Sequence, residues 1–195
     1  MNRLEASRVL TECAGDAPIV ASLGHPAYDL FAAGDRPANF YTWGSMGVAS
    51  SIGLGIAIGR PDLRVFVADG DGSLLMNLGS LATIGWTAPP NLVLIVWDNE
   101  EYATTGGQPT ATARGADLEA AGRAMGIQAS VTVRDEPELR RAIARAQTEP
   151  GPWMITAKVA ESAPQARPPL DCVFIKQRFM SAIGSPESAT RGGPA

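Results

Sequence analysis

The sequence predicts an α/β fold of the doubly wound type, in which a mainly parallel sheet carries helices on both faces. Two apolar runs, at residues 65–68 and 92–96, are continuous and rich in β-branched side chains. Such runs are typical of strands that are buried on both faces of a parallel sheet. The segment between them is long enough for one crossover helix. Strand and helix signals alternate along the rest of the chain, which extends the same pattern.

The chain before residue 61 predicts two short strands and three helices. The expected strands are residues 17–22 and 39–42, with a turn at 23–26, and the expected helices are residues 3–12, 28–32 and 49–58. The third helix is small and apolar almost all round, which indicates tight packing on the sheet. Its glycines, Gly53, Gly55 and Gly59, would each weaken an isolated helix by about 1 kcal/mol. We therefore expect close helix-to-sheet or chain-to-chain packing to compensate.

The remainder of the chain continues the alternation. The expected strands are residues 64–68, 91–97, 128–133 and 152–157, and the expected helices are residues 74–86, 117–125, 170–183 and one that starts with a capping box at Asp135. Residues 100–113 form a polar, glycine-rich loop of a length that is usually functional or disordered. We expect a single domain at residues 1–183 and a disordered tail at 184–195.

Composition excludes several classes of function. The net charge is −4 with no basic stripe, so we expect no nucleic-acid partner. No apolar run reaches the ~18 residues of a membrane helix, and the N-terminus does not resemble a signal peptide. Cys13 and Cys172 lie far apart without metal-ligand spacing, which favours free thiols and a cytoplasmic location. His25 is the single histidine, so no site in this chain can use a histidine pair.

Polar residues follow the two apolar runs at the point where each predicted strand ends. Gly70 and Gly72 allow a sharp turn that holds Asp71 at the edge of the sheet, and Ser73 begins a helix where a phosphate is favoured. Asn99 follows the second run and supplies an amide oxygen. In open α/β sheets, ligands bind at this edge. A carboxylate beside a phosphate cradle calls for a bridging cation, and Mg²⁺ uses such oxygen ligands. The simpler interpretation is a helix cap at Asp71 and an ordinary turn at Asn99.

These residues resemble the fingerprint of thiamine diphosphate enzymes, in which a Gly-Asp-Gly turn is followed, one strand–helix–strand unit later, by paired asparagines. This chain has Asp98 at the first asparagine position and keeps Asn99 at the second. The resemblance implies Mg²⁺ ligands at Asp71, the Asn99 side chain and the backbone carbonyl of Glu101.

A second resemblance extends over residues 18–180. The stretch from Gly44 to Ser51 and the loop from Thr105 to Thr110 are similar to segments of sulfopyruvate and phosphonopyruvate decarboxylases. The likeness is nearest to a separate β subunit that consists of the diphosphate-binding domain. The cofactor-binding residues that it implies are Gly24, His25, Gly44, Ser45, Met46, Gly70, Asp71, Gly72, Ser73, Asn99, Glu101 and Tyr102.

Two of these residues are implied to have catalytic roles. Met46 would be the apolar wedge that bends the cofactor, although a methionine is also a common core residue. His25 lies in the first loop, which in this group approaches the diphosphate or the substrate, although a lone histidine is often a surface residue. Val48 stands where the group often has histidine, and this departure leaves the substrate open.

The resemblance implies decarboxylation of a small 2-oxo acid, such as sulfopyruvate or phosphonopyruvate, to CO₂ and an aldehyde. It also implies a hetero-oligomer, because the activating glutamate would come from a separate pyrimidine-binding (α) subunit. A carboligating enzyme on the same scaffold and a non-catalytic cofactor-binding subunit remain as alternatives. A nicotinamide- or flavin-binding domain would need a Gly-x-Gly-x-x-Gly turn after the first strand, and the sequence has none there.

Overall fold

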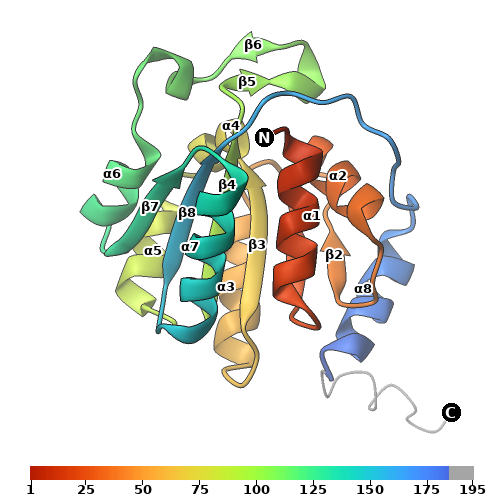
Figure 1. Cartoon of the computed structure of the whole chain (residues 1–195). Coiled ribbons are helices and arrows are strands. Elements are labelled where there is room, and N and C mark those ends of the chain that lie inside the picture. The colour runs from red at the N-terminus through yellow and green to blue at the C-terminus, as the bar shows by residue number, and fades with distance from the viewer. Residues whose placement is uncertain (185–195) are drawn as a thin grey trace, which may run out of the picture.

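The central feature of the fold is a six-stranded sheet in which every pair of neighbouring strands is parallel (Figure 1). The computed structural model describes residues 1–184. The strand order is β2-β1-β3-β4-β8-β7. The strands are β1 (Ile19–Ala21), β2 (Asn39–Tyr41), β3 (Val65–Gly70), β4 (Leu92–Asp98), β7 (Ala129–Val133) and β8 (Trp153–Lys158). This arrangement confirms the predicted mainly parallel sheet.

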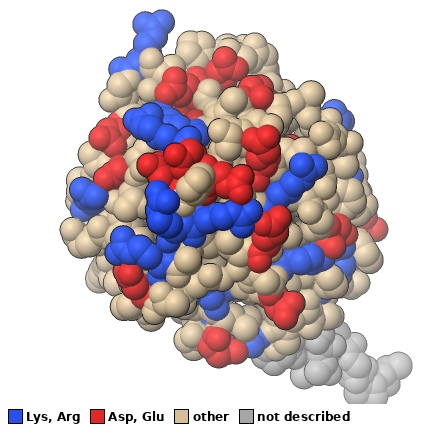
Figure 2. Space-filling view, in the orientation of Figure 1, with Lys and Arg blue, Asp and Glu red and all other residues tan. Residues whose placement is uncertain are grey.

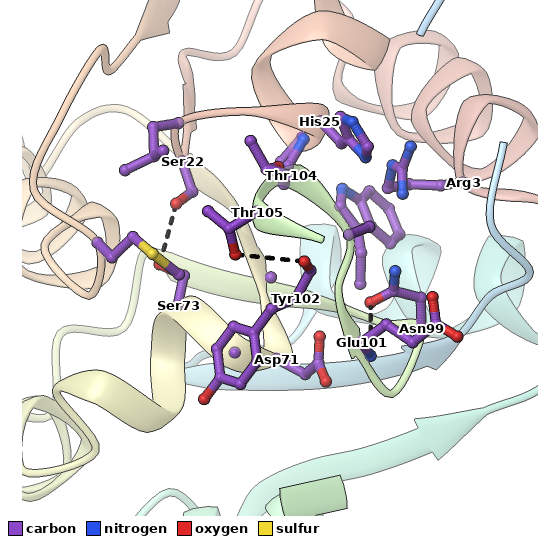
Figure 3. Close-up of a pocket in the computed structure, with 17 residues that line it drawn as sticks. Arg3, Ser22, His25, Asp71, Ser73, Asn99, Glu101, Tyr102, Thr104 and Thr105 are labelled. Carbon is purple, nitrogen blue, oxygen red and sulfur yellow. Dashed lines mark hydrogen bonds between the residues drawn. The ribbon is translucent and has the colours of Figure 1, made fainter. Parts of the chain in front are cut away.

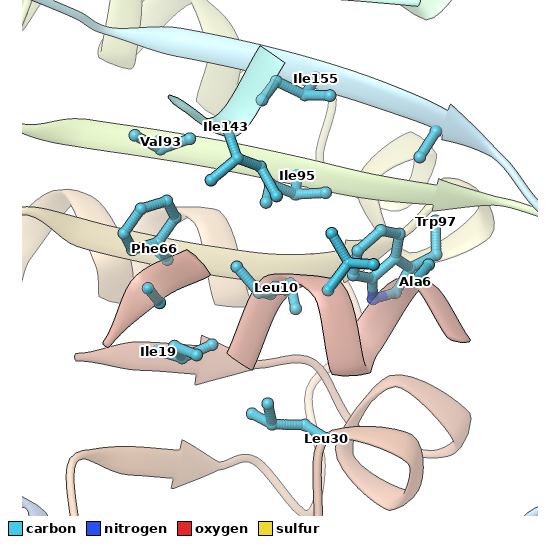
Figure 4. Close-up of a cluster of buried hydrophobic side chains, with 14 of the residues drawn as sticks. Ala6, Leu10, Ile19, Leu30, Phe66, Val93, Ile95, Trp97, Ile143 and Ile155 are labelled. Atoms are coloured by element: carbon cyan, nitrogen blue, oxygen red, sulfur yellow. The ribbon is translucent and has the colours of Figure 1, made fainter. Parts of the chain in front are cut away.

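Helices cover both faces of the sheet, so the doubly wound prediction is also confirmed. One face packs against α1 (Arg3–Ala14), α2 (His25–Ala33), α7 (Glu136–Thr148) and α8 (Cys172–Ala182), and the other packs against α3 (Ala49–Gly59), α4 (Asp71–Met76), α5 (Ser80–Thr87) and α6 (Leu118–Ala124). Phe66, Ile95 and Ile155 point from the central strands toward the first set of helices (Figure 4). Their neighbours Val67 and Leu94 belong to the second core cluster. The strands are therefore apolar on both faces, as their continuous runs predicted.

The outer surface over α1 and α7 is charged. Figure 2 shows acidic and basic side chains intermingled on this face. Arg140 of α7 pairs there with Glu12 of α1 at 2.7 Å and with Glu136 at 2.8 Å. No helix in the described part of the chain is long and apolar enough to cross a membrane.

The prediction of one helix at residues 74–86 is wrong, because the structure has two helices, α4 and α5, in that region. Asn77 ends α4, and its side-chain Nδ2 donates a hydrogen bond to the carbonyl of Gly47 at 2.9 Å. The backbone of Asn77 is not helical, with φ −138° and ψ 47°, and Gly79 stands before α5. The break in the helix thus coincides with a contact with a distant loop.

Two other local expectations need correction. The predicted turn at residues 23–26 is partly wrong, since His25 and Pro26 already form the first turn of α2, where proline is favoured. The predicted loop at 100–113 contains a two-stranded antiparallel hairpin. The hairpin strands are β5 (Glu101–Tyr102) and β6 (Gln108–Pro109), with the short helix η1 (Ala103–Thr105) between them. A second short helix, η2 (Ala111–Arg114), follows the hairpin. The predicted disordered tail lies outside the described residues from position 185 onward.

The segment that joins β8 to α8 crosses the carboxyl edge of the sheet beside the N-terminus (Figure 1). We call residues 159–171 the crossing segment. Its start forms a parallel bridge in which Ala160 N donates to the Met1 carbonyl at 3.1 Å, and Arg3 N donates to the Ala160 carbonyl at 3.2 Å. The N-terminus and the crossing segment are therefore held together at the edge where the predicted site lies.

One glycine of α3 is required by packing. A Cβ at Gly53 would overlap Cγ2 of Val67 on β3 and would lie 3.5 Å from Leu92 Cδ1. Gly55 and Gly59 have no neighbouring atom within 4 Å of such a position. Close helix-to-sheet packing therefore accounts for Gly53 and not for the other two glycines.

This difference gives a test of the packing. We expect Gly53→Ala to lower the free energy of unfolding by about 1–3 kcal/mol, because the added methyl group forces α3 away from β3. Gly55→Ala, in the same helix, should instead raise it by up to about 1 kcal/mol, because alanine favours helix and meets open space. Chemical denaturation of the two variants and the wild type measures both effects. A stabilised Gly53→Ala protein would contradict the packing described here.

Candidate functional site

The carboxyl ends of β1, β3 and β4 open into a pocket (Figure 3). Nine of the residues predicted from the sequence line it: His25, Met46, Gly70, Asp71, Gly72, Ser73, Asn99, Glu101 and Tyr102. Gly44 and Ser45 lie in the exposed turn before Met46 and are not among the lining residues. Gly24 lies against Thr104, which itself lines the pocket. The structure therefore brings most of the predicted residues together at one edge of the sheet.

Asp71 is the buried carboxylate of the pocket. It begins α4 and is 2% exposed. Its Oδ2 accepts a hydrogen bond from Thr110 Oγ1 at 2.5 Å and lies 3.0 Å from Thr112 Oγ1. Burial raises the pKa of Asp71, and the nearby charge of Asp98 raises it further. Among the described residues, no basic side chain forms an ion pair with Asp71, so its negative charge is uncompensated.

Asp98 differs from Asp71 because it has a cationic partner. Lys158 Nζ lies 2.7 Å from Asp98 Oδ2 and 2.7 Å from Glu100 Oε1. Thr112 Oγ1 donates to Asp98 Oδ1 at 2.8 Å, so one hydroxyl lies between the two buried aspartates. An acid is therefore accommodated where the family fingerprint often has an amide. The cross-strand register pairs Asp98 with Lys158. In the sequence, the lysine at the end of the expected last strand was the available signal that Asp98 has a cationic partner.

Asn99 is half-buried just after β4 and presents the two ends of its amide to different partners. Its Nδ2 donates to Glu161 Oε2 at 2.7 Å. Its Oδ1 has a long contact, 3.4 Å, with the backbone N–H of Glu101. The oxygen thus keeps acceptor capacity for a ligand.

The turn after β3 is closely packed. Ser73 Oγ accepts from the backbone N–H of Gly47 at 2.9 Å and lies 3.0 Å from Ser22 Oγ. A Cβ at Gly72 would overlap the ring of Tyr102, so a side chain at this position would displace the hairpin loop from the pocket. Asp69, just before the turn, is fully buried, and burial raises its pKa.

Met46 reaches the pocket from the turn before α3. The next residue, Gly47, has φ +84°, a left-handed conformation that favours glycine. Gly47 is held on both sides, since its N–H donates to Ser73 and its carbonyl accepts from Asn77. The position of Met46 therefore depends on the same break between α4 and α5 that sequence reasoning missed. Val48, the cap residue of α3, is half-buried and does not line the pocket.

His25 is the first residue of α2 and lines the pocket near Arg3 (Figure 3). Burial lowers the pKa of His25, and the charge of Arg3 lowers it further, so the neutral imidazole is favoured. Its Nδ1 lies 3.1 Å from Glu161 Oε1, without the geometry of a hydrogen bond.

Arg3 was missed by sequence reasoning. It is 2% exposed and lines the pocket. Its Nε pairs with the fully buried Asp29, and its Nη1 pairs with Glu161 at 2.5 Å. Helix pattern alone could have identified only its position on the first turn of a helix, because its partners come from distant segments.

The donor set fits a divalent cation with a phosphate group. Asp71 is a buried carboxylate without a cation, and Asn99 offers an amide oxygen with acceptor capacity in the same pocket. No group of three or more His, Cys, Asp or Glu side chains that could hold a metal occurs among residues 1–184. A Mg²⁺ ion that completes its shell with phosphate oxygens and waters needs only one or two protein carboxylates. Mg²⁺ binding therefore stays a prediction with which these residues agree.

Comparison with known proteins gives three findings. A family model described as thiamine pyrophosphate enzyme, C-terminal TPP binding domain, matches residues 27–157. The sulfopyruvate decarboxylase subunit beta of Methanococcus maripaludis is 42% identical over 186 residues, which cover 94% of this chain and 98% of that protein. The phosphonopyruvate decarboxylase of Streptomyces viridochromogenes is 37% identical over 185 residues, which cover 94% of this chain and 46% of that protein.

Solved structures show the same fold. An X-ray structure assigned as a thiamin diphosphate-dependent enzyme from Mycobacterium smegmatis superposes with a TM-score of 0.66 at 23% identity. The match covers 84% of this chain and 32% of that chain. The likeness to this structure concerns the fold alone. The family match over residues 27–157 and the 42% identity over nearly the whole chain show that this chain belongs to the thiamine pyrophosphate (thiamine diphosphate) enzymes and carries their C-terminal TPP binding domain.

Proposed function

We propose that this chain is the Mg²⁺- and diphosphate-binding subunit of a two-subunit thiamine diphosphate-dependent decarboxylase. Its substrate would be a small 2-oxo acid such as sulfopyruvate or phosphonopyruvate, and its products CO₂ and an aldehyde. The observation that carries the proposal is the uncompensated Asp71 carboxylate in one pocket with Asn99. The near full-length likeness to a sulfopyruvate decarboxylase subunit beta supports the choice of reaction.

In this proposal, the residues at the strand ends divide the binding of the cofactor between them. Asp71, the Asn99 side chain and the Glu101 backbone carbonyl hold Mg²⁺, while Gly72 and Ser73 hold the diphosphate. Thr110 and Thr112 fix one oxygen of Asp71, which leaves the other for the metal. Burial of the carboxylate keeps water away and strengthens its attraction for the cation.

Met46 and His25 would contact the remaining part of the cofactor or the substrate, since both line the pocket. The half-buried thioether of Met46 enters the pocket and would press on the apolar part of the cofactor. When bound, thiamine diphosphate supplies the electron sink for the loss of CO₂. A neutral His25 could accept or donate a hydrogen bond at the substrate, in keeping with the lowered pKa of its side chain.

A partner chain is part of this proposal. The chain matches nearly the whole length of a β subunit and less than half of a phosphonopyruvate decarboxylase, so the pyrimidine-binding half would come from a separate α subunit. That subunit would supply the activating glutamate.

Asp71 gives the most direct test of the site. We expect Asp71→Ala to weaken Mg²⁺-dependent binding of thiamine diphosphate by at least about 100-fold in the assembly with the partner subunit, because it removes a charged ligand. Calorimetric titration of the assembly with thiamine diphosphate in Mg²⁺ measures the affinity. Asp62→Ala, which removes an exposed aspartate that pairs with Arg60, is the matched control and should bind like the wild type. Unchanged affinity of Asp71→Ala would sink the assignment of the metal site.

The split of the active site gives a second test. We expect the purified chain alone to release no CO₂ from sulfopyruvate or phosphonopyruvate with Mg²⁺ and thiamine diphosphate, because the activating glutamate is on the partner. Addition of the pyrimidine-binding subunit should restore release of CO₂ and formation of the aldehyde. Robust turnover by this chain alone would refute the two-subunit proposal, and a carbon–carbon condensation product in place of the aldehyde would identify a carboligase.

A further inference from the structure

Glu161 connects three pocket residues that come from different parts of the chain. It lies in the crossing segment, 62 positions after Asn99. One oxygen of its carboxylate, Oε2, accepts from Asn99 Nδ2 at 2.7 Å and from Arg3 Nη1 at 2.5 Å. The other, Oε1, lies 3.1 Å from His25 Nδ1. Figure 3 shows Arg3, His25 and Asn99 together on the same side of the pocket.

The contact with Asn99 selects which end of the amide faces the pocket. An amide has an N–H₂ end, which donates, and an oxygen end, which accepts and can bind a cation. An ionised carboxylate can only accept, so the N–H₂ end must be the one that faces Glu161. The oxygen end is then left for the pocket side of Asn99. Groups beyond the metal ligands orient those ligands in this way in many metal sites.

The position of Glu161 is fixed independently of Asn99. The preceding residue, Ala160, is bridged to the N-terminus through two backbone hydrogen bonds. Arg3, which binds Glu161, is itself buried and held by Asp29 and by the carbonyl of Ser162, 2.9 Å from Nη2. The acceptor is therefore in place before any ligand binds.

We propose that Glu161 is a positioning residue that turns the Asn99 amide oxygen toward the metal of the cofactor site. The proposal rests on the proposed function, because it takes Asn99 as a metal ligand. It assigns a role in cofactor binding to the crossing segment and to the first residues of the chain. Glu161 itself is not a ligand, and it acts through the hydrogen bond to Asn99.

A double-mutant cycle tests this role by calorimetric titration of the assembly with thiamine diphosphate in Mg²⁺. We expect Glu161→Ala to weaken binding about tenfold, as is typical when a group behind a metal ligand is lost. Glu161→Gln should keep most of the affinity, because its side-chain oxygen can still accept from Asn99. In an Asn99→Ala background, Glu161→Ala should cause no further loss, because the residue on which Glu161 acts is absent. Glu12→Ala, which removes an exposed ion pair with Arg140, is the matched control and should bind normally.

Each outcome bears on one of the two proposals. If the wild-type assembly shows no Mg²⁺-dependent binding, the proposed function fails and the role of Glu161 fails with it. If the wild type binds and Glu161→Ala binds equally well, only the role of Glu161 fails. Equal losses from Glu161→Ala with and without Asn99 would likewise overturn it, because Glu161 would then act elsewhere.

An inverted pair tests the same contact if Glu161→Ala does not fold. Asn99→Asp would place two carboxylates against each other and should lose affinity. Combination with Glu161→Gln restores a donor opposite an acceptor and should recover it. No recovery would overturn the proposal. Thermal unfolding of the variants without cofactor separates a loss of fold from a loss of binding.

Discussion

A buried carboxylate without a cation of its own is the constraint on which the site depends. Asp71 is 2% exposed at the end of a central strand, and burial raises its pKa. Such a group is costly unless an opposite charge accompanies it. Thr110 donates a hydrogen bond to Asp71 and the Thr112 hydroxyl lies beside the same oxygen, but neither residue supplies a charge. The pocket is thus suited to a bound cation, in agreement with the proposed Mg²⁺ site.

Much of the fold and the core of the site could be predicted because they depend on short stretches of sequence. The apolar runs before Asp71 and Asn99 identify two buried strands, and parallel strands must bring their carboxyl ends to one edge. In the register of β3 and β4, Gly70 pairs with Trp97. Asp71 and Asn99 therefore lie just beyond the ends of two neighbouring strands. These predictions needed no knowledge of how distant segments approach.

The parts that sequence reasoning missed depend on contacts between distant segments. The helix expected at residues 74–86 breaks at Asn77, which bonds to Gly47, 30 positions away. Arg3 and Glu161 are 158 positions apart and meet only because the crossing segment is bridged to the N-terminus. Glu161 lies in no motif, and the helix pattern around Arg3 says nothing of its partners, so nothing local marks either residue as part of the site. The role of a polar residue at the end of a strand or segment can be assigned only when the residues that it contacts in the fold are known.

The end of β8 shows how the edge of the sheet balances its charges. Lys158 is the last residue of this strand and Glu161 follows it, and they contact the adjacent residues Asp98 and Asn99, respectively. The carboxylate of Asp98 requires a cation, which Lys158 supplies. The amide nitrogen of Asn99 requires an acceptor, which Glu161 supplies. With Asp98 neutralised in this way, Asp71 is the buried pocket-lining carboxylate of the described chain that has no ion-pair partner. The uncompensated negative charge of the pocket is therefore that of Asp71, which together with the oxygen of Asn99 is what we propose to bind Mg²⁺.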